Sequence, residues 1–148
     1  MGEQIRKLKE ANIDISVTPG VPSFAAAAAS IDKELTLPGL AQSVVLTRTQ
    51  GRASAMPDDE SLENFARTGS TLAIHLSIHN LGYIVEKLIP FYGANCPIVV
   101  IFRASWPDQQ IIKGELYTIE NRMPKEIERT AIIFVGSCLD NDQFNNSR

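Results

Sequence analysis

Two arginines stand in a glycine-containing loop that directly follows a predicted strand. The segment LTRTQGRASAMPDDE (46–60) places Arg48 and Arg52 four residues apart. Two guanidinium groups at this spacing are able to hold carboxylates through bidentate hydrogen bonds. The alternative is a solvated loop in which the arginines pair with the acidic residues 58–60. The residues alone favour this second interpretation slightly.

A strand-to-helix turn is the second candidate site. The segment VTPGVPSFAAAAA (17–29) contains Thr18-Pro19-Gly20, which ends a predicted strand, followed by an alanine-rich stretch with high helix propensity. Backbone N–H groups at such a turn suit a carboxylate or another polar ligand group. An ordinary strand-to-helix connection is the alternative, and without further observations it is favoured.

His75 and His79 have the spacing of a metal-binding pair on a helix. The surrounding LAIHLS pattern indicates a strand, however, where residues four apart lie about 13 Å from each other. The glutamate of an HExxH motif is also missing. We therefore expect no metal site, with His75 as a half-buried strand residue. Asn80 is expected to cap the next helix.

The segment FRASWPDQ (102–109) places Arg103, Trp106 and Asp108 at the end of an apolar strand. Ligands of open α/β sheets bind at the carboxyl ends of strands. The alternative is a tryptophan that packs under its own loop. No GxSxG or Cys-His nucleophile signature is present in the sequence. The residues therefore indicate a binding surface made of backbone turns and arginines.

Alternating helices and strands position these motifs. Helices are expected at about 2–11, 22–31, 60–68, 80–90 and 115–122, and strands at 13–17, 43–47, 71–77, 97–102, 110–113 and 130–135. This order predicts an α/β fold with a mixed sheet flanked by helices. The sequence opens on a helix and contains no GxGxxG or GxxxxGK[ST] loop, so either the fold needs no such loop or an earlier part is absent.

Composition narrows the functional classes. The chain has 148 residues, 44% hydrophobic and 21% charged, which is the size of one domain. Its net charge of -3 argues against a nucleic-acid or anionic-membrane surface. The two cysteines do not suggest a disulfide framework, and no apolar run approaches the ~20 residues of a membrane span. We expect a soluble cytoplasmic protein.

Five motifs in order resemble one family, the tetrapyrrole (corrin/porphyrin) methylases. They are VTPGVPS with its alanine-rich helix, SVVLTRTQGR with MPDDESL, TLAIHLSIHN, IVVIFRASWPDQ with IIKGEL, and RTAIIFVG. The TRxxGR and RASWPD segments resemble the branch that methylates carbon 11 of precorrin-4. The resemblance covers about residues 3 to 139 and implies two α/β domains, with S-adenosylmethionine in the cleft between them, usually in a homodimer.

The same resemblance implies that residues 1–40 are a remnant of the N-terminal α/β domain and that 41–148 form the C-terminal methylase domain. The Gly-rich turns of the family's N-terminal domain are missing from the sequence. We therefore expect a fragment that is inactive alone. The expected activity of the complete protein is S-adenosylmethionine-dependent methylation in cobalamin biosynthesis, with the cobalt-containing substrate favoured.

The resemblance also implies roles for individual residues. The turn at 20–23 is expected to approach the methionine part of the cofactor, although Pro22 replaces a common Ser or Thr. His75 and Leu76 are expected to lie against the adenosine, and Ala104 to receive the adenine. The full expected cofactor set is Gly20, Val21, Pro22, Ser23, His75, Leu76, Ala104, Thr130 and Ala131. Arg48 and Arg52 are expected to face the acidic tetrapyrrole, and no general base is assigned.

Two other functions stay open at this point. The first is a non-catalytic binding or dimerisation module with the same fold. The second is a different tetrapyrrole methylase, acting on another precorrin or on uroporphyrinogen. The product made by the complete protein would separate them.

Overall fold

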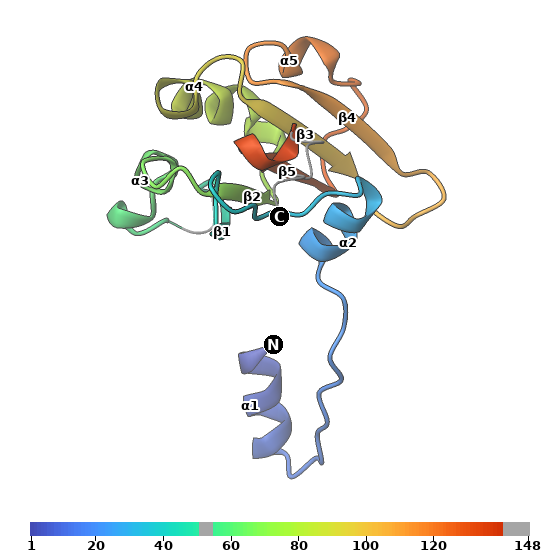
Figure 1. The fold of residues 1–148 in the computed structure, drawn as a ribbon. Coiled ribbons are helices and arrows are strands. Elements are labelled where there is room, and N and C mark those ends of the chain that lie inside the picture. Colours follow the sequence, from blue (N-terminus) through green and yellow to red (C-terminus); the bar gives the residue numbers. More distant parts are fainter. Residues whose placement is uncertain (51–54, 141–148) are drawn as a thin grey trace.

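A five-stranded mixed sheet forms the body of the protein. The structure is a computed structural model and describes residues 1–50 and 55–140. The strand order is β1-β2-β5-β3-β4 (Figure 1). The strands are β1 (Val44–Arg48), β2 (Thr71–His75), β3 (Pro97–Phe102), β4 (Gln110–Glu115) and β5 (Ala131–Val135). β1 and β2 are parallel, whereas β5 runs antiparallel to both β2 and β3, and β3 antiparallel to β4.

The three central strands carry the core on both faces of the sheet. In β2 the alternate residues Leu72 and Ile74 point into one hydrophobic cluster, whereas Ala73 points into the other. β3 and β5 divide their side chains in the same way, and most of them are completely buried. Continuous apolar sequence is what a strand covered on two faces requires.

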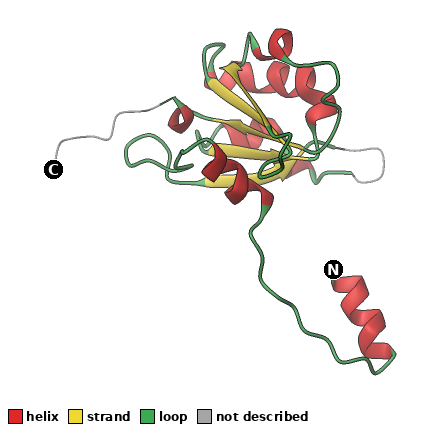
Figure 2. Cartoon of the chain, turned by 90° about the vertical axis from the view of Figure 1, so that its right-hand side faces the viewer, coloured by secondary structure: helices red, strands yellow, loops and turns green. Residues whose placement is uncertain are grey.

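Helices cover the two faces unequally (Figure 2). One face packs against α4 (Leu81–Tyr92), whose buried residues Leu81, Ile84, Val85 and Leu88 recur at the three- and four-residue spacing of a helix. Two shorter helices accompany it, α3 (Leu62–Ala66) and α5 (Ile119–Arg122). The other face carries α2 (Ser23–Ser30) and the last of the short 3-10 turns, which are Asp58–Glu60, Ile78–Asn80 and Ser137–Leu139.

Small side chains bring α2 close to the sheet. Ala27 is completely buried and belongs to the same cluster as Phe134 of β5 and Ile101 of β3. Alanine has a high helix propensity and adds little volume, so the helix backbone can approach the strands. The packing of α2 on β5 places its first residue, Ser23, near one edge of the sheet.

The first 22 residues project away from this body. α1 (Gly2–Glu10) has no buried residue, and an extended segment connects it to α2 (Figures 1 and 2). The expected strand at 13–17 is wrong: these residues form no strand, although Ile13 and Val17 alternate as strand residues do. A strand needs a hydrogen-bonded neighbour, and no described segment pairs with this one.

The predicted α/β class and mixed sheet are confirmed, and the remaining elements deviate mainly at their ends. The helix expected at 115–122 is shorter because Thr118 forms a turn first, its hydroxyl donating to the carbonyl of Glu115 and accepting from the N–H of Glu115, both at 3.1 Å. Among the described residues, no helix has the length and apolar character needed to cross a membrane.

Candidate functional site

Most of the residues singled out from the sequence lie at one edge of the sheet, by which we mean the edge formed by strand ends and not an outermost strand. β2 and β3 end at this edge, and the antiparallel β5 begins there. His75 pairs with Ile132, and Phe102 pairs with Ala131, across these strands. The segments around His75, Ala104 and Thr130 are therefore neighbours in space although they are distant in the sequence. Carboxyl ends of strands at one edge are the usual place for a ligand site in α/β proteins.

Backbone strain is concentrated at this same edge. Leu76 follows β2 with a φ of 54°, Arg103 and Ser105 follow β3 with φ of 46° and 69°, and Thr130 precedes β5 with a φ of 59°. Left-handed backbone costs non-glycine residues of order 1–3 kcal/mol and persists mainly at functional positions. Leu76 in addition exposes 77% of its surface. The fold thus holds an apolar side chain outward in an unfavourable conformation.

The loop after β3 is built to present Ala104. The Arg103 guanidinium lies 5.1 Å from the Phe102 ring centroid and 5.4 Å from that of Trp106, and it forms an ion pair with Asp108. The Ser105 N–H donates to the side-chain carbonyl of Gln109 at 2.7 Å. Ala104 lies between two left-handed residues, and its own N–H and C=O make no hydrogen bond within the described part of the chain. A ligand could therefore use both groups.

The amino end of α2 meets the end of β2 through a histidine. Ser23 Oγ lies 3.4 Å from Nδ1 of His75, and the Phe24 and His75 rings are in edge contact with centroids 6.5 Å apart. The other ring nitrogen, Nε2, is buried without a hydrogen-bond partner in the described chain. Burial lowers the pKa of His75, so the neutral imidazole predominates near pH 7.

The other residues of the expected turn, 20–22, have no hydrogen-bonding contact with the strand ends. Gly20, Val21 and Pro22 are exposed and belong to the extended segment that leads into α2, and Val21 exposes 78% of its surface. Ser23 alone of this turn has a hydrogen-bonding contact with the strand ends. The first turn of α2 leaves N–H groups without intrahelical partners, and these lie at the amino end of the helix, where Ser23 is.

Arg48 lies beside His75 on the neighbouring strand. The two residues are paired in the parallel register of β1 and β2, and Arg48 is exposed. Both line an open pocket of about 570 Å³, whose other walls come from β1, from residues 55–57, and from Glu60 and Phe65. The expected second arginine, Arg52, lies outside the described residues. A cation and a neutral histidine therefore share one pocket next to the strained edge.

A buried hydroxyl network at this edge was not foreseen from the sequence. Ser77 Oγ accepts hydrogen bonds from the N–H of Thr49 at 2.7 Å and from its hydroxyl at 3.0 Å. The same Ser77 hydroxyl donates to the carbonyl of His75 at 2.7 Å. Asn80 occupies the expected N-cap position of α4, but its side chain makes no cap hydrogen bond and donates to Thr49 Oγ1 at 2.7 Å instead. The only sequence signal was the position of these polar residues just after two strands.

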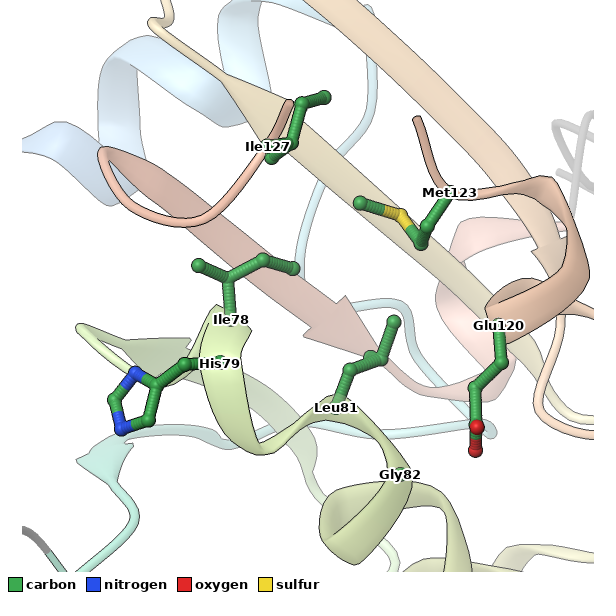
Figure 3. Close-up of a pocket in the computed structure, with 7 residues that line it drawn as sticks. All are labelled: Ile78, His79, Leu81, Gly82, Glu120, Met123 and Ile127. Carbon is green, nitrogen blue, oxygen red and sulfur yellow. The ribbon is translucent and has the colours of Figure 1, made fainter. Parts of the chain in front are cut away.

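A second pocket, of about 230 Å³, opens on the α4 face of the sheet (Figure 3). Its walls are mainly Ile78, Leu81, Met123 and Ile127, with Gly82 below them. His79 and Glu120 stand at opposite sides of the pocket in Figure 3. The pocket therefore does not bring an acid and a base together.

The thiols do not offer a nucleophile. Cys96 and Cys138 are both buried. Burial raises the pKa of the Cys96 thiol to about 11, which keeps it protonated at physiological pH. Among the described residues, the groups gathered at the strand ends are suited to binding and orientation: backbone groups, His75 and Arg48.

Several known proteins with similar sequences are named methyltransferases. The sequence model of the tetrapyrrole (corrin/porphyrin) methylases matches residues 1–120. A precorrin-4 C(11)-methyltransferase of Sinorhizobium sp is 53% identical over 99% of this chain and 58% of its own length. A cobalt-precorrin-4 C(11)-methyltransferase of Methanocaldococcus jannaschii is 41% identical over 93% of the chain and 54% of its own length. The chain thus spans between half and two thirds of these relatives.

Solved structures agree with the sequence comparison. The X-ray structure of a cobalamin biosynthetic enzyme, cobalt precorrin-4 methyltransferase, superposes with a TM-score of 0.88 at 35% identity, over 95% of this chain and 59% of that one. A uroporphyrin-III C-methyltransferase of Thermus thermophilus, solved with S-adenosyl homocysteine, gives 0.72 at 24% identity, over 93% and 59%, and supports the fold alone. The chain belongs to the tetrapyrrole (corrin/porphyrin) methylase family.

Proposed function

We propose that the protein carrying this chain is an S-adenosylmethionine-dependent methyltransferase that acts on carbon 11 of precorrin-4 in cobalamin biosynthesis. The observation that carries the proposal is the 53% identity, over 99% of the chain, to a relative with this activity in its name. The chain spans 58% of that relative, so the activity is proposed for a protein of the relative's length, with this chain inactive by itself.

The strained sheet edge is the proposed cofactor wall. Support comes from the unpaired backbone groups of Ala104, the outward Leu76 and the orphaned Nε2 of His75, which together offer polar groups beside an apolar surface. Adenosine needs such a combination, because its base is flat and its edge carries donors and acceptors. Membership of the methylase family adds support for a methyl-donor cofactor of this class. The full proposed contact set is Gly20, Val21, Pro22, Ser23, His75, Leu76, Ala104, Thr130 and Ala131.

Orientation and desolvation are what these residues would contribute to the reaction. S-adenosylmethionine supplies a methyl group that is already activated on a sulfonium. The Ala104 backbone would fix the adenine, and Leu76 would exclude water from the adenosine. His75, held neutral by burial, would not place a second positive charge beside a cationic cofactor. A fixed relative position of donor and acceptor is the main rate-enhancing factor available here.

The acidic tetrapyrrole is proposed to bind at Arg48 and Arg52. Arg48 is exposed at the mouth of the 570 Å³ pocket, where its fork can pair with acetate or propionate groups. Relatives named precorrin-4 and cobalt-precorrin-4 enzymes both match the chain, so the cobalt-containing substrate expected from the sequence stays a proposal beside the metal-free one. Activity on the two substrates in competition would decide between them.

The assignment of domains, assembly and compartment is also proposed. The division into residues 1–40 and 41–148 is supported by the projecting first 22 residues, although α2 itself packs on the sheet of the second part. We propose a homodimer in the cytoplasm, with no nucleic-acid or membrane partner, as the family resemblance implies.

Calorimetry with S-adenosylhomocysteine tests the cofactor proposal. The full-length protein that contains this sequence should bind it with micromolar or better affinity, and the 148-residue chain only weakly. Tight binding by the chain alone would contradict the proposed division of the cleft. No binding by the full-length protein would overturn the cofactor assignment itself.

A non-catalytic module of the same fold is the second candidate, favoured by the partial coverage of every relative described above. Under that function, the full-length protein would bind no cofactor. A different tetrapyrrole substrate is the third candidate, and the 53% identity to a precorrin-4 enzyme favours precorrin-4 over it.

A further inference from the structure

We propose that Thr49 and Ser77 form a clamp that couples the tetrapyrrole-binding end of β1 to the cofactor-binding end of β2. The proposal rests on the proposed function, since it assigns the two ligands to the two strand ends. Ser77 and Thr49 are positioning residues here, because they act through their neighbours and touch neither ligand. The clamp consists of Thr49, Ser77, Asn80 and the backbone of His75.

The geometry of the clamp leaves no hydrogen-bonding capacity unused at its centre. The Ser77 hydroxyl donates once, to the carbonyl of His75, and accepts twice, from the N–H and the hydroxyl of Thr49. A hydroxyl has one donor and two acceptor sites, so it is saturated. Thr49 Oγ1 in turn accepts from the Asn80 amide. Such a fully satisfied network permits one arrangement and disfavours others.

Burial makes this arrangement costly to break. Ser77 is completely buried and Thr49 is 6% exposed, so water cannot replace a lost partner easily. A buried polar group that loses its hydrogen bond keeps the full cost of its desolvation. A displacement of Thr49 relative to Ser77 would leave several such groups unsatisfied at once. The two strand ends are therefore held in one relative position.

The clamp residues are the immediate neighbours of the proposed ligand-binding residues. Thr49 follows Arg48 directly, so the hydrogen bond from its N–H fixes the backbone from which the arginine projects. Ser77 follows Leu76, and its bond to the carbonyl of His75 bridges the left-handed residue between them. One hydroxyl therefore sets both the direction of the arginine and the outward position of Leu76.

Replacing the Thr49 hydroxyl while keeping its shape tests the clamp. In the full-length protein, Thr49→Val should weaken S-adenosylhomocysteine and uroporphyrin, used as an acidic tetrapyrrole probe, each on the order of tenfold, because one lost buried network bond is comparable to a tenfold affinity change. Thr49→Ser keeps the hydroxyl and should restore both affinities. Titration of each ligand by calorimetry gives the two dissociation constants.

Thr71→Val is the matched control. Thr71 is also a completely buried threonine, but it begins β2 at the opposite edge of the sheet, and its Oγ1 has no partner in the described structure. This variant should leave both affinities within about twofold of the starting protein, since it removes no hydrogen bond. A further variant, Ser77→Ala, removes the acceptor of the Thr49 N–H, so hydrogen exchange should show lost protection of that amide. Thr71→Val should keep the protection.

The outcomes separate the two proposals. If the full-length protein binds neither ligand, the proposed function fails. If it binds both and Thr49→Val behaves like Thr71→Val, the clamp is overturned while the function stands. Loss of affinity for one ligand without the other would also overturn the coupling.

Discussion

The backbone N–H of Arg103 donates to the carbonyl of Thr130 at 3.0 Å, and both residues hold left-handed backbone conformations. This bond joins the end of β3 to the start of β5 just beyond the regular ladder. Two strained residues thereby fix each other at the edge that we propose as the cofactor wall. Strain that persists in this way is better explained by a binding requirement than by folding alone.

Relief of this strain should raise the stability of the protein while it weakens cofactor binding. Thr130→Gly removes a β-branched residue from a φ of 59°, and we expect the free energy of unfolding to rise by about 0.5–1 kcal/mol after the entropic cost of glycine. Cofactor affinity should fall, because the backbone becomes freer. The neighbouring Arg129→Gly, at a residue without positive φ, should lower stability instead. Urea unfolding measures the stability of the two variants, and calorimetry measures their cofactor affinity. A Thr130→Gly variant that is less stable than the starting protein would contradict the account.

The ion pair between Arg103 and Asp108 should matter for binding more than for stability. Both side chains are partly exposed, so Asp108→Asn should change the free energy of unfolding by less than about 1 kcal/mol. Arg103 would lose its anchor over Trp106, the single tryptophan of the chain, and the fluorescence emission should shift. Affinity for S-adenosylhomocysteine should drop several-fold.

Glu63→Gln is the control for that experiment. Glu63 forms a 3.0 Å ion pair with Lys87 between α3 and α4, away from the loop that follows β3. This variant should leave both the tryptophan emission and the cofactor affinity unchanged. If it altered them as much as Asp108→Asn does, a specific role of the loop would be untenable.

Substrate affinity should depend on the shape of the Arg48 side chain as well as on its charge. Arg48→Lys keeps the charge but loses the planar fork, and we expect about tenfold weaker binding of uroporphyrin, with S-adenosylhomocysteine unaffected. Arg67→Lys is the matched control, because Arg67 lies over the Phe91 ring and does not line the pocket of Arg48. Equal tetrapyrrole affinities in the two variants would exclude Arg48 from the site.

Stability should decline on acidification because of His75. Burial lowers its pKa in the folded state, so below the ordinary value of about 6.5 the unfolded chain takes up the proton first. The free energy of unfolding therefore falls as the pH falls through this range, until the folded pKa is passed. His75→Gln should show a smaller decline between pH 7 and 5. His79→Gln removes the other histidine and is the control, measured by urea unfolding at each pH.

Local sequence signals predicted most of the fold. Apolar runs such as PIVVIF gave β3 with its observed bounds, and the alanine stretch gave α2. The strand at 13–17 failed because alternation describes a segment suited to a sheet, whereas a strand also needs a partner. Asn80 takes the expected N-cap position of α4 but makes no side-chain cap bond, and its amide N–H instead donates to Thr49, 31 residues away. Such long-range hydrogen bonds leave no periodic trace in a sequence.

The candidate site was only partly accessible from the sequence. Motifs placed His75, Ala104 and Thr130 in separate segments, and the antiparallel insertion of β5 between β2 and β3 is what unites them. The left-handed conformation of Leu76 could not be read from its residue type, since leucine rarely adopts it. The clamp between Thr49 and Ser77 was missed as well, because serine and threonine after a strand are common and carry no distinctive pattern.

Transfer of a labelled methyl group tests the central claim most directly. The full-length protein that contains this sequence would be incubated with precorrin-4 and S-adenosylmethionine carrying carbon-13 in its methyl group, and the product examined by NMR. The account predicts one new labelled methyl group, bonded to carbon 11 of the macrocycle. A labelled methyl at another carbon, or an unchanged substrate with active cofactor present, would contradict it.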